Sequence, residues 1–125
     1  MINLLNKKID KKQLKIAIIG LGYVGLPIAL AFSKYFQVYG FDIDTKRISE
    51  LKKGIDRNEI SSSNLDYSKK LIFTSNFKNL IDSDFFIITV PTPVGKNNIP
   101  NLSYLNRAIK NLLKIDLKKK FIVVE

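Results

Sequence analysis

Three glycines stand at a spacing that suits phosphate binding. Gly20, Gly22 and Gly25 form a Gly-x-Gly-x-x-Gly pattern directly after an apolar run. In a strand–turn–helix unit the first glycine allows a tight turn, the second lets the backbone approach a pyrophosphate, and the third lets the helix pack closely on the strand. The unpaired N–H groups and positive dipole end of that helix favour an anion. The pattern predicts a dinucleotide-binding turn; the alternative is a tight turn without a ligand.

An acidic residue follows where such a turn requires one. Asp42 comes 22 positions after Gly20 and closes a second apolar run. A carboxylate at the end of that strand can bond the adenosine ribose hydroxyls and repels a 2′-phosphate, so NAD is favoured over NADP. Asp44 competes for this role but is better explained as a helix cap. Arg47 can stack on the adenine or reach the ribose, and the alternative is a solvated surface arginine.

A proline-rich segment is the third candidate for ligand contact. Val90-Pro91-Thr92-Pro93 follows the apolar run at 84–90. In an open parallel sheet, ligands bind at the carboxyl ends of the strands, where the strand order reverses. The alternative is a chain reversal that uses prolines as breakers. The chain has no histidine and no cysteine, and its carboxylates show no pairing in one cleft, so neither a catalytic residue nor a metal site is predicted.

Alternating strands and helices must position these residues. Five apolar runs are expected to form strands, at 15–19, 37–41, 71–74, 84–90 and from 121 onward. With helices between them they predict an α/β fold, a Rossmann-like doubly wound parallel sheet of order 3-2-1-4-5. The chain stops at Glu125 within what reads as a buried strand, which suggests the front part of a longer protein.

Three segments show apolar residues at helical spacing, which we expect to be buried. These stripes are Val24, Ile28, Phe32 and Tyr35; Ile48, Leu51 and Ile55; and Leu102, Leu105, Ile109 and Leu112. Gly54 is the expected stop of the second helix. Residues 56–70 are expected to form a loop, with a short helix as an option. Residues 1–13 read as a polar, basic arm, and residues 14–125 as a single Rossmann domain.

The composition argues against several other classes. The net charge is +10, but 18 of the 21 basic residues are lysines, mostly scattered, and no aromatic residues interleave with the clusters at 7–12 and 118–120. A stacking platform needs such aromatics, so no nucleic-acid partner is expected. The first thirteen residues lack the apolar stretch of a signal peptide, and no run of about 18 apolar residues occurs. We therefore expect no membrane partner and a cytoplasmic location.

Longer motifs carry a family resemblance. They are Gly20-Leu21-Gly22-Tyr23-Val24-Gly25-Leu26-Pro27, Phe41-Asp42-Ile43-Asp44-Thr45-Lys46-Arg47 and Val90-Pro91-Thr92-Pro93. From about Lys15 onward, the chain resembles the amino-terminal, NAD-binding domain of the UDP-glucose/GDP-mannose dehydrogenase family. The segment 54–59, Gly-Ile-Asp-Arg-Asn-Glu, is similar to the branch that acts on UDP-N-acetylhexosamines for surface polysaccharides.

The resemblance implies an NAD-dependent oxidation of the sugar C6 alcohol to a uronate, by two hydride transfers through a cysteine thioester. It places NAD contacts on Gly20, Leu21, Gly22, Tyr23, Val24, Gly25, Asp42, Ile43 and Arg47, and on the segment from Ile88 to Thr92 with Val90, Pro91 and Thr92. Val90 departs from the threonine that relatives often carry, which leaves no side-chain hydroxyl at that position. The family's catalytic residues, UDP-sugar pocket and dimer helix would lie beyond Glu125.

This chain alone is therefore expected to bind NAD without oxidising a sugar, because a thioester step requires a cysteine. The whole enzyme is expected to be a homodimer, and this chain by itself is compatible with a monomer. Two alternatives stay open. One is a regulatory dinucleotide-sensing module, and the other is a hydroxyacid-type dehydrogenase.

Overall fold

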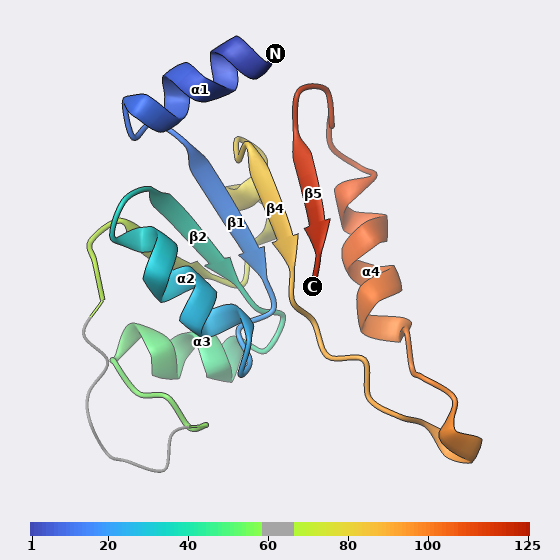
Figure 1. Ribbon diagram of the computed structural model, residues 1–125. Coiled ribbons are helices and arrows are strands. Elements are labelled where there is room, and N and C mark those ends of the chain that lie inside the picture. The colour runs from blue at the N-terminus through green and yellow to red at the C-terminus, as the bar shows by residue number, and fades with distance from the viewer. Residues whose placement is uncertain (59–66) are drawn as a thin grey trace.

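The sheet has the predicted strand order. The computed structural model describes residues 1–58 and 67–125 and contains a five-stranded parallel sheet of order β3-β2-β1-β4-β5. Its strands are β1 (Lys15–Ile19), β2 (Gln37–Phe41), β3 (Leu71–Thr74), β4 (Phe85–Ile88) and β5 (Phe121–Val124). The predicted α/β Rossmann-like class is confirmed. β4 ends two residues earlier than predicted (Figure 1).

β1 is the central strand and separates two apolar cores. Because side chains alternate across a strand, Ile16 and Ile18 enter one core while Ala17 and Ile19 enter the other. The first core is covered by α2 (Gly25–Ser33) and α3 (Thr45–Lys52), and the second by the 3-10 helix η1 (Phe77–Leu80) and α4 (Ser103–Leu112). Because helices cover both faces of the sheet, both sets of β1 side chains are buried. This explains why the sequence of β1 is almost continuously apolar.

The helix after the glycines turns a different face to the core than the stripe predicted. The buried side chains of α2 include Leu26, Ala29 and Ser33, whereas Val24, Phe32 and Tyr35 are exposed and Ile28 is half-buried. The prediction was wrong because α2 is apolar almost all round, so periodicity cannot choose a face. The tight turn before the helix sets its rotation instead.

The other two helices match their stripes in part. In α3, Ile48 and Leu51 are buried as predicted, but Ile55 is exposed because the helix ends at Lys52 and Gly54 turns the chain at a φ of +77°. In α4 the buried residues are Ala108 and Leu112. Of the predicted stripe, Leu105 is partly buried, while Leu102 and Ile109 are exposed. The true inner face of α4 lies slightly to one side of the predicted one.

The two chain ends also differ from expectation. The segment expected as a basic arm contains α1 (Ile2–Asp10), which lies where the strands begin (Figure 1). Leu5 packs against the first core, and Lys8 pairs with Asp84. Lysine is a good helix former, so the basic composition does not prevent a helix. β5, expected to be buried, exposes residues 122–124 because it lies at the sheet edge and pairs only with β4.

Between β4 and α4 the chain runs through residues 91–102, which project away from the sheet and contain the short 3-10 helix η2 (Lys96–Asn98) (Figure 1). An isolated bridge pairs Val94 with Pro100. Residues 59–66, with most of the predicted 56–70 loop or short helix and the final Glu59 of the 54–59 motif, lie outside the described residues.

Candidate functional site

The three glycines of the turn are required for three different reasons. Gly20 has a φ of +102°, a conformation that favours glycine. A Cβ on Gly25 would overlap the carbonyl oxygen of Gly20 and the hydroxyl of Thr89, so the helix can start here only without a side chain. A Cβ on Gly22 would meet no atom within 4 Å. Packing therefore does not explain Gly22, whose Cα side is open to the approach of another molecule.

A threonine of the predicted 88–92 segment stabilises this turn from the neighbouring strand, a role that the sequence analysis did not predict. Thr89, directly after β4, is buried and donates its hydroxyl to the carbonyl oxygen of Gly20 at 2.7 Å. Its backbone N–H donates to Ile19 at 2.9 Å. The available signal was a polar residue at the end of an otherwise apolar strand. Thr89 therefore holds the turn against the sheet, next to the position where Val90 lacks a hydroxyl.

Asp42 lies at the carboxyl end of β2 and binds the glycine turn. Its Oδ2 accepts the backbone N–H of Leu21 at 2.9 Å, and its Oδ1 accepts that of Asp44 at 3.0 Å. Each carboxylate oxygen has two lone pairs, so both retain capacity for a further donor. Asp44 caps α3 through the N–H groups of Lys46 and Arg47, as predicted.

The cap gives a pH-dependent prediction. The hydrogen bond from the Arg47 N–H is the largest cause that holds the pKa of Asp44 below its ordinary 3.8, and the nearby Arg57 charge adds to it. Because this pKa is lower in the folded than in the unfolded state, the ionised Asp44 carboxylate stabilises the folded protein at pH values above the unfolded-state pKa of about 3.9. The stabilisation is lost as the pH falls through the folded-state pKa. Asp44→Ala should therefore lower Tm at pH 7, by a difference that narrows below pH ~4 in thermal denaturation.

Asp44→Asn is the matched control, because asparagine also caps helices but does not titrate in this range. Its Tm difference from Asp44→Ala should persist at low pH. A gap between wild type and Asp44→Ala that stays constant down to pH ~3 would assign the stabilisation to something other than the ionised carboxylate.

Arg47 is buried and supports the glycine turn, so the alternative interpretation of a solvated surface arginine is wrong. The residue is 4% exposed. Its Nε and Nη2 donate to the carbonyl oxygen of Leu21 at 3.0 and 2.8 Å, and its Nη1 pairs with Asp56 at 2.5 Å. Asp56 was not among the predicted site residues, because nothing in its sequence surroundings shows that it meets Arg47.

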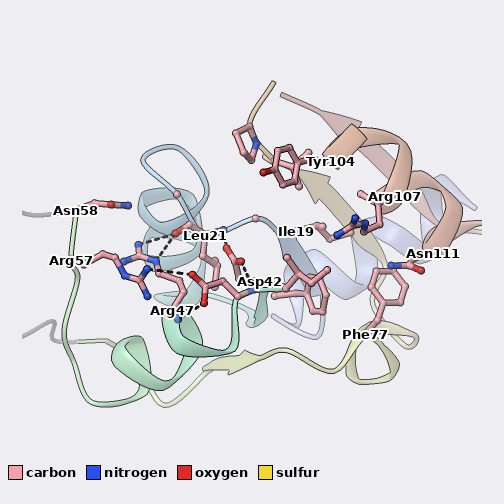
Figure 2. Close-up of a pocket in the computed structure, with 18 residues that line it drawn as sticks. Ile19, Leu21, Asp42, Arg47, Arg57, Asn58, Phe77, Tyr104, Arg107 and Asn111 are labelled. Carbon is pink, nitrogen blue, oxygen red and sulfur yellow. Dashed lines mark hydrogen bonds and ion pairs between the residues drawn. The ribbon is translucent and has the colours of Figure 1, made fainter. Parts of the chain in front are cut away.

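A cleft of about 330 Å³ opens between the glycine turn and α4 (Figure 2). Eight predicted residues line it: Gly20, Leu21, Gly22, Asp42, Ile43, Arg47, Val90 and Pro91. Tyr23, Val24, Gly25 and Thr92 do not line it. Tyr23 is 80% exposed on the outside of the turn, and Gly25 is covered by the turn itself.

The far wall of the cleft comes from elements that the sequence analysis did not connect with the site. Tyr104, Arg107 and Asn111 reach it from α4, and Phe77 from η1 (Figure 2). Their spacing of three and four places the α4 residues on one helix face, beside the buried Ala108. That periodicity was the only available signal, and it could not reveal which loop faces them.

The cleft offers groups suited to binding a nucleotide. It combines an open turn, carboxylate acceptors and apolar walls formed by Ile19, Phe41 and Phe77. Within residues 1–58 and 67–125, no group of three histidine, cysteine, aspartate or glutamate side chains could hold a metal ion. No helix in that part of the chain is long and apolar enough to cross a membrane. A nucleotide with a pyrophosphate and a ribose fits these groups.

Known proteins share this sequence and fold. Residues 14–125 match the model of the UDP-glucose/GDP-mannose dehydrogenase family, NAD binding domain. UDP-N-acetyl-D-glucosamine 6-dehydrogenase of Pseudomonas aeruginosa is 45% identical over 114 residues, which are 90% of this chain and 27% of that protein. The protein of the same name from Salmonella typhi is 50% identical over 97 residues, which are 77% of this chain and 23% of that protein.

Among solved structures, the UDP-D-ManNAc dehydrogenase of Pyrococcus horikoshii superposes with a TM-score of 0.80 at 33% identity, over 90% of this chain and 28% of that one. The chain thus spans about a quarter of the length of these relatives. Because the family match begins directly before β1 and covers the glycine turn, Asp42 and the whole cleft, the chain belongs to the UDP-glucose/GDP-mannose dehydrogenase family, as its NAD-binding domain.

Proposed function

We propose that this chain is the cofactor-binding part of an NAD-dependent dehydrogenase that oxidises the C6 alcohol of a UDP-N-acetylhexosamine to a uronate for surface polysaccharides. The observation that carries the NAD part is the pairing of an open Gly22 with a carboxylate, Asp42, on the same cleft. The sugar class is supported by the names of the two similar proteins from Pseudomonas aeruginosa and Salmonella typhi and by the 54–59 motif.

The predicted contacts differ in how far the structure supports them. Gly20, Leu21, Gly22 and Asp42 are proposed for the pyrophosphate and ribose, since they line the cleft with the backbone of the turn and a carboxylate. Ile43, Val90 and Pro91 are proposed as apolar walls, and Arg47 as a contact at the same edge. Gly25 contributes by packing. Tyr23, Val24 and Thr92 lie outside the cleft lining, so their contacts rest on the family resemblance alone.

Bound NAD would supply a hydride acceptor. This chain has no cysteine for a thioester, and we propose that the residues acting on the sugar belong to other parts of a longer protein, so that this chain alone is inactive. The homodimeric state of the whole enzyme, its cytoplasmic location and the division of this chain at residue 14 stay predictions.

A thermal-shift comparison tests the cofactor. A ligand present at 100 times its dissociation constant should stabilise the chain by about 2.7 kcal/mol. NAD is expected to raise Tm, and NADP to raise it much less, because the Asp42 carboxylate repels a 2′-phosphate. Stabilisation by NADP alone would contradict the role of Asp42, and no shift with either dinucleotide would contradict the proposed function. In the whole protein, two NADH should form for each UDP-sugar consumed.

A further inference from the structure

The peptide groups of Leu21 are held from two sides. Its N–H donates to Asp42, and its carbonyl oxygen accepts two hydrogen bonds from the Arg47 guanidinium, at 3.0 and 2.8 Å. Leu21 lies between Gly20 and Gly22, so the same contacts fix the direction of the next N–H, that of Gly22. Figure 2 shows Arg47 reaching up to this carbonyl from below the turn.

The Arg47 guanidinium that binds the Leu21 carbonyl is itself held by a residue from another loop. Asp56, after α3, pairs with Nη1 of Arg47 at 2.5 Å, and the two side chains are only 5% and 9% exposed. The Asp56 Oδ1 also accepts the backbone N–H of Asn58 at 3.1 Å, which restrains the carboxylate. A guanidinium is always charged and its donors form a rigid planar fork, so a carboxylate on one side determines where the other donors point.

A neighbouring, more exposed ion pair shows why the burial of Arg47 makes it depend on Asp56. Arg57 pairs with Glu50 at 2.5 Å, but its side chain is 39% exposed, so water screens the pair and can replace either partner. Arg47 is buried, and among residues 1–58 and 67–125 loss of Asp56 would leave its charge with the Leu21 carbonyl as the remaining acceptor. The guanidinium would then be expected to move toward solvent and release Leu21.

We propose that Asp56 is a positioning residue of the NAD site. It fixes Arg47, Arg47 fixes the Leu21 carbonyl, and the backbone N–H groups of the glycine turn are thereby aimed at the pyrophosphate. Asp56 does not line the cleft, so we assign it a role through Arg47, which does. The inference rests on the proposed function, because it concerns affinity for NAD.

The first test is calorimetric titration of the 125-residue chain with NAD. Asp56→Asn keeps the size of the side chain but removes the charge, and it should raise the NAD dissociation constant about tenfold, which corresponds to ~1.4 kcal/mol. Asp84→Asn is the matched control. Like Asp56, Asp84 pairs with a basic side chain, that of Lys8, and accepts a backbone N–H, that of Lys15, but it lies at the amino ends of the strands. The Asp84→Asn variant should have a lower Tm than the wild type and the same affinity for NAD.

A double-mutant cycle separates positioning from general weakening of the fold. If Asp56 acts through Arg47, then Asp56→Asn should weaken NAD binding less than about twofold further in an Arg47→Lys background, because interacting residues are not additive. In ¹⁵N spectra of the chain without NAD, the amide signals of Leu21 and Gly22 should shift in Asp56→Asn and stay in place in Asp84→Asn.

Arg47→Lys alone keeps the inference testable if Asp56→Asn does not fold. Lysine keeps the charge opposite Asp56, but one ammonium group cannot reproduce the planar fork. Unchanged NAD affinity in either folded variant, or full additivity in the cycle, would overturn the role of Asp56. Failure of the wild-type chain to bind NAD would instead overturn the proposed function, so the two results are distinguishable.

Discussion

Gly25→Ala is expected to lower the free energy of unfolding by about 3 kcal/mol, the upper end of the usual cost of overpacking. The added methyl group would overlap the Gly20 carbonyl oxygen and the Thr89 hydroxyl. These two atoms are hydrogen-bonded to each other at 2.7 Å, and one of them belongs to the backbone, so neither can move away without breaking the turn. Urea denaturation of the variant and the wild type measures this difference.

Gly22→Ala is the matched control for this prediction. Its Cβ would point into open space, so the free energy of unfolding should stay close to that of the wild type. Its affinity for NAD should fall, because the methyl group would occupy the space that a pyrophosphate needs. Equal stability losses in the two variants would show that the close approach of α2 to the turn is not what requires Gly25.

Asp42→Ala is expected to raise the dissociation constant of NAD about 100-fold, which corresponds to ~2.8 kcal/mol. Hydrogen bonds to a charged group contribute about 1.5–3 kcal/mol each, and the carboxylate retains acceptors toward the cleft. The loss includes an indirect part, because Asp42 also binds the N–H of Leu21. Isothermal titration calorimetry with the folded variant provides the measurement.

Asp42→Asn separates charge from hydrogen bonding. It keeps one acceptor oxygen but loses the negative charge, so the preference for NAD over NADP should narrow even where NAD affinity is partly kept. Asp82→Ala, at an exposed aspartate that does not line the cleft, serves as the control and should bind NAD like the wild type. Unchanged NAD affinity in Asp42→Ala would transfer the ribose role to another residue.

Local sequence patterns were sufficient to predict the strands and the glycine turn. The apolar runs at 15–19, 37–41 and 71–74 coincide with β1, β2 and β3, because buried strands need continuous apolar residues. The connection rules for parallel strands then leave the order 3-2-1-4-5. The roles of Gly20 and Gly25 also follow from the backbone, since a positive φ and a close approach exclude side chains whatever the surroundings.

Patterns failed where a residue's surroundings come from distant parts of the chain. The buried face of α2 could not be chosen, because this helix is apolar on nearly every side and its rotation is set by Gly25 against Gly20. For the α4 residues that line the cleft, such as Arg107, the spacing in the sequence indicates only that they share a helix face. Which strand ends that face meets depends on the crossover between β4 and β5.

The sequence by itself determined the class of fold, the turn and the carboxylate that favours NAD, because each is encoded within a few residues of backbone geometry or charge. Only the tertiary structure decided how that turn is supported. From its spacing Arg47 reads either as a contact to the adenine or ribose or as a solvated arginine, and only folding buries it between the Leu21 carbonyl and Asp56. The contacts join residues 26 and 9 positions apart, and no local spacing specifies that a guanidinium will find them.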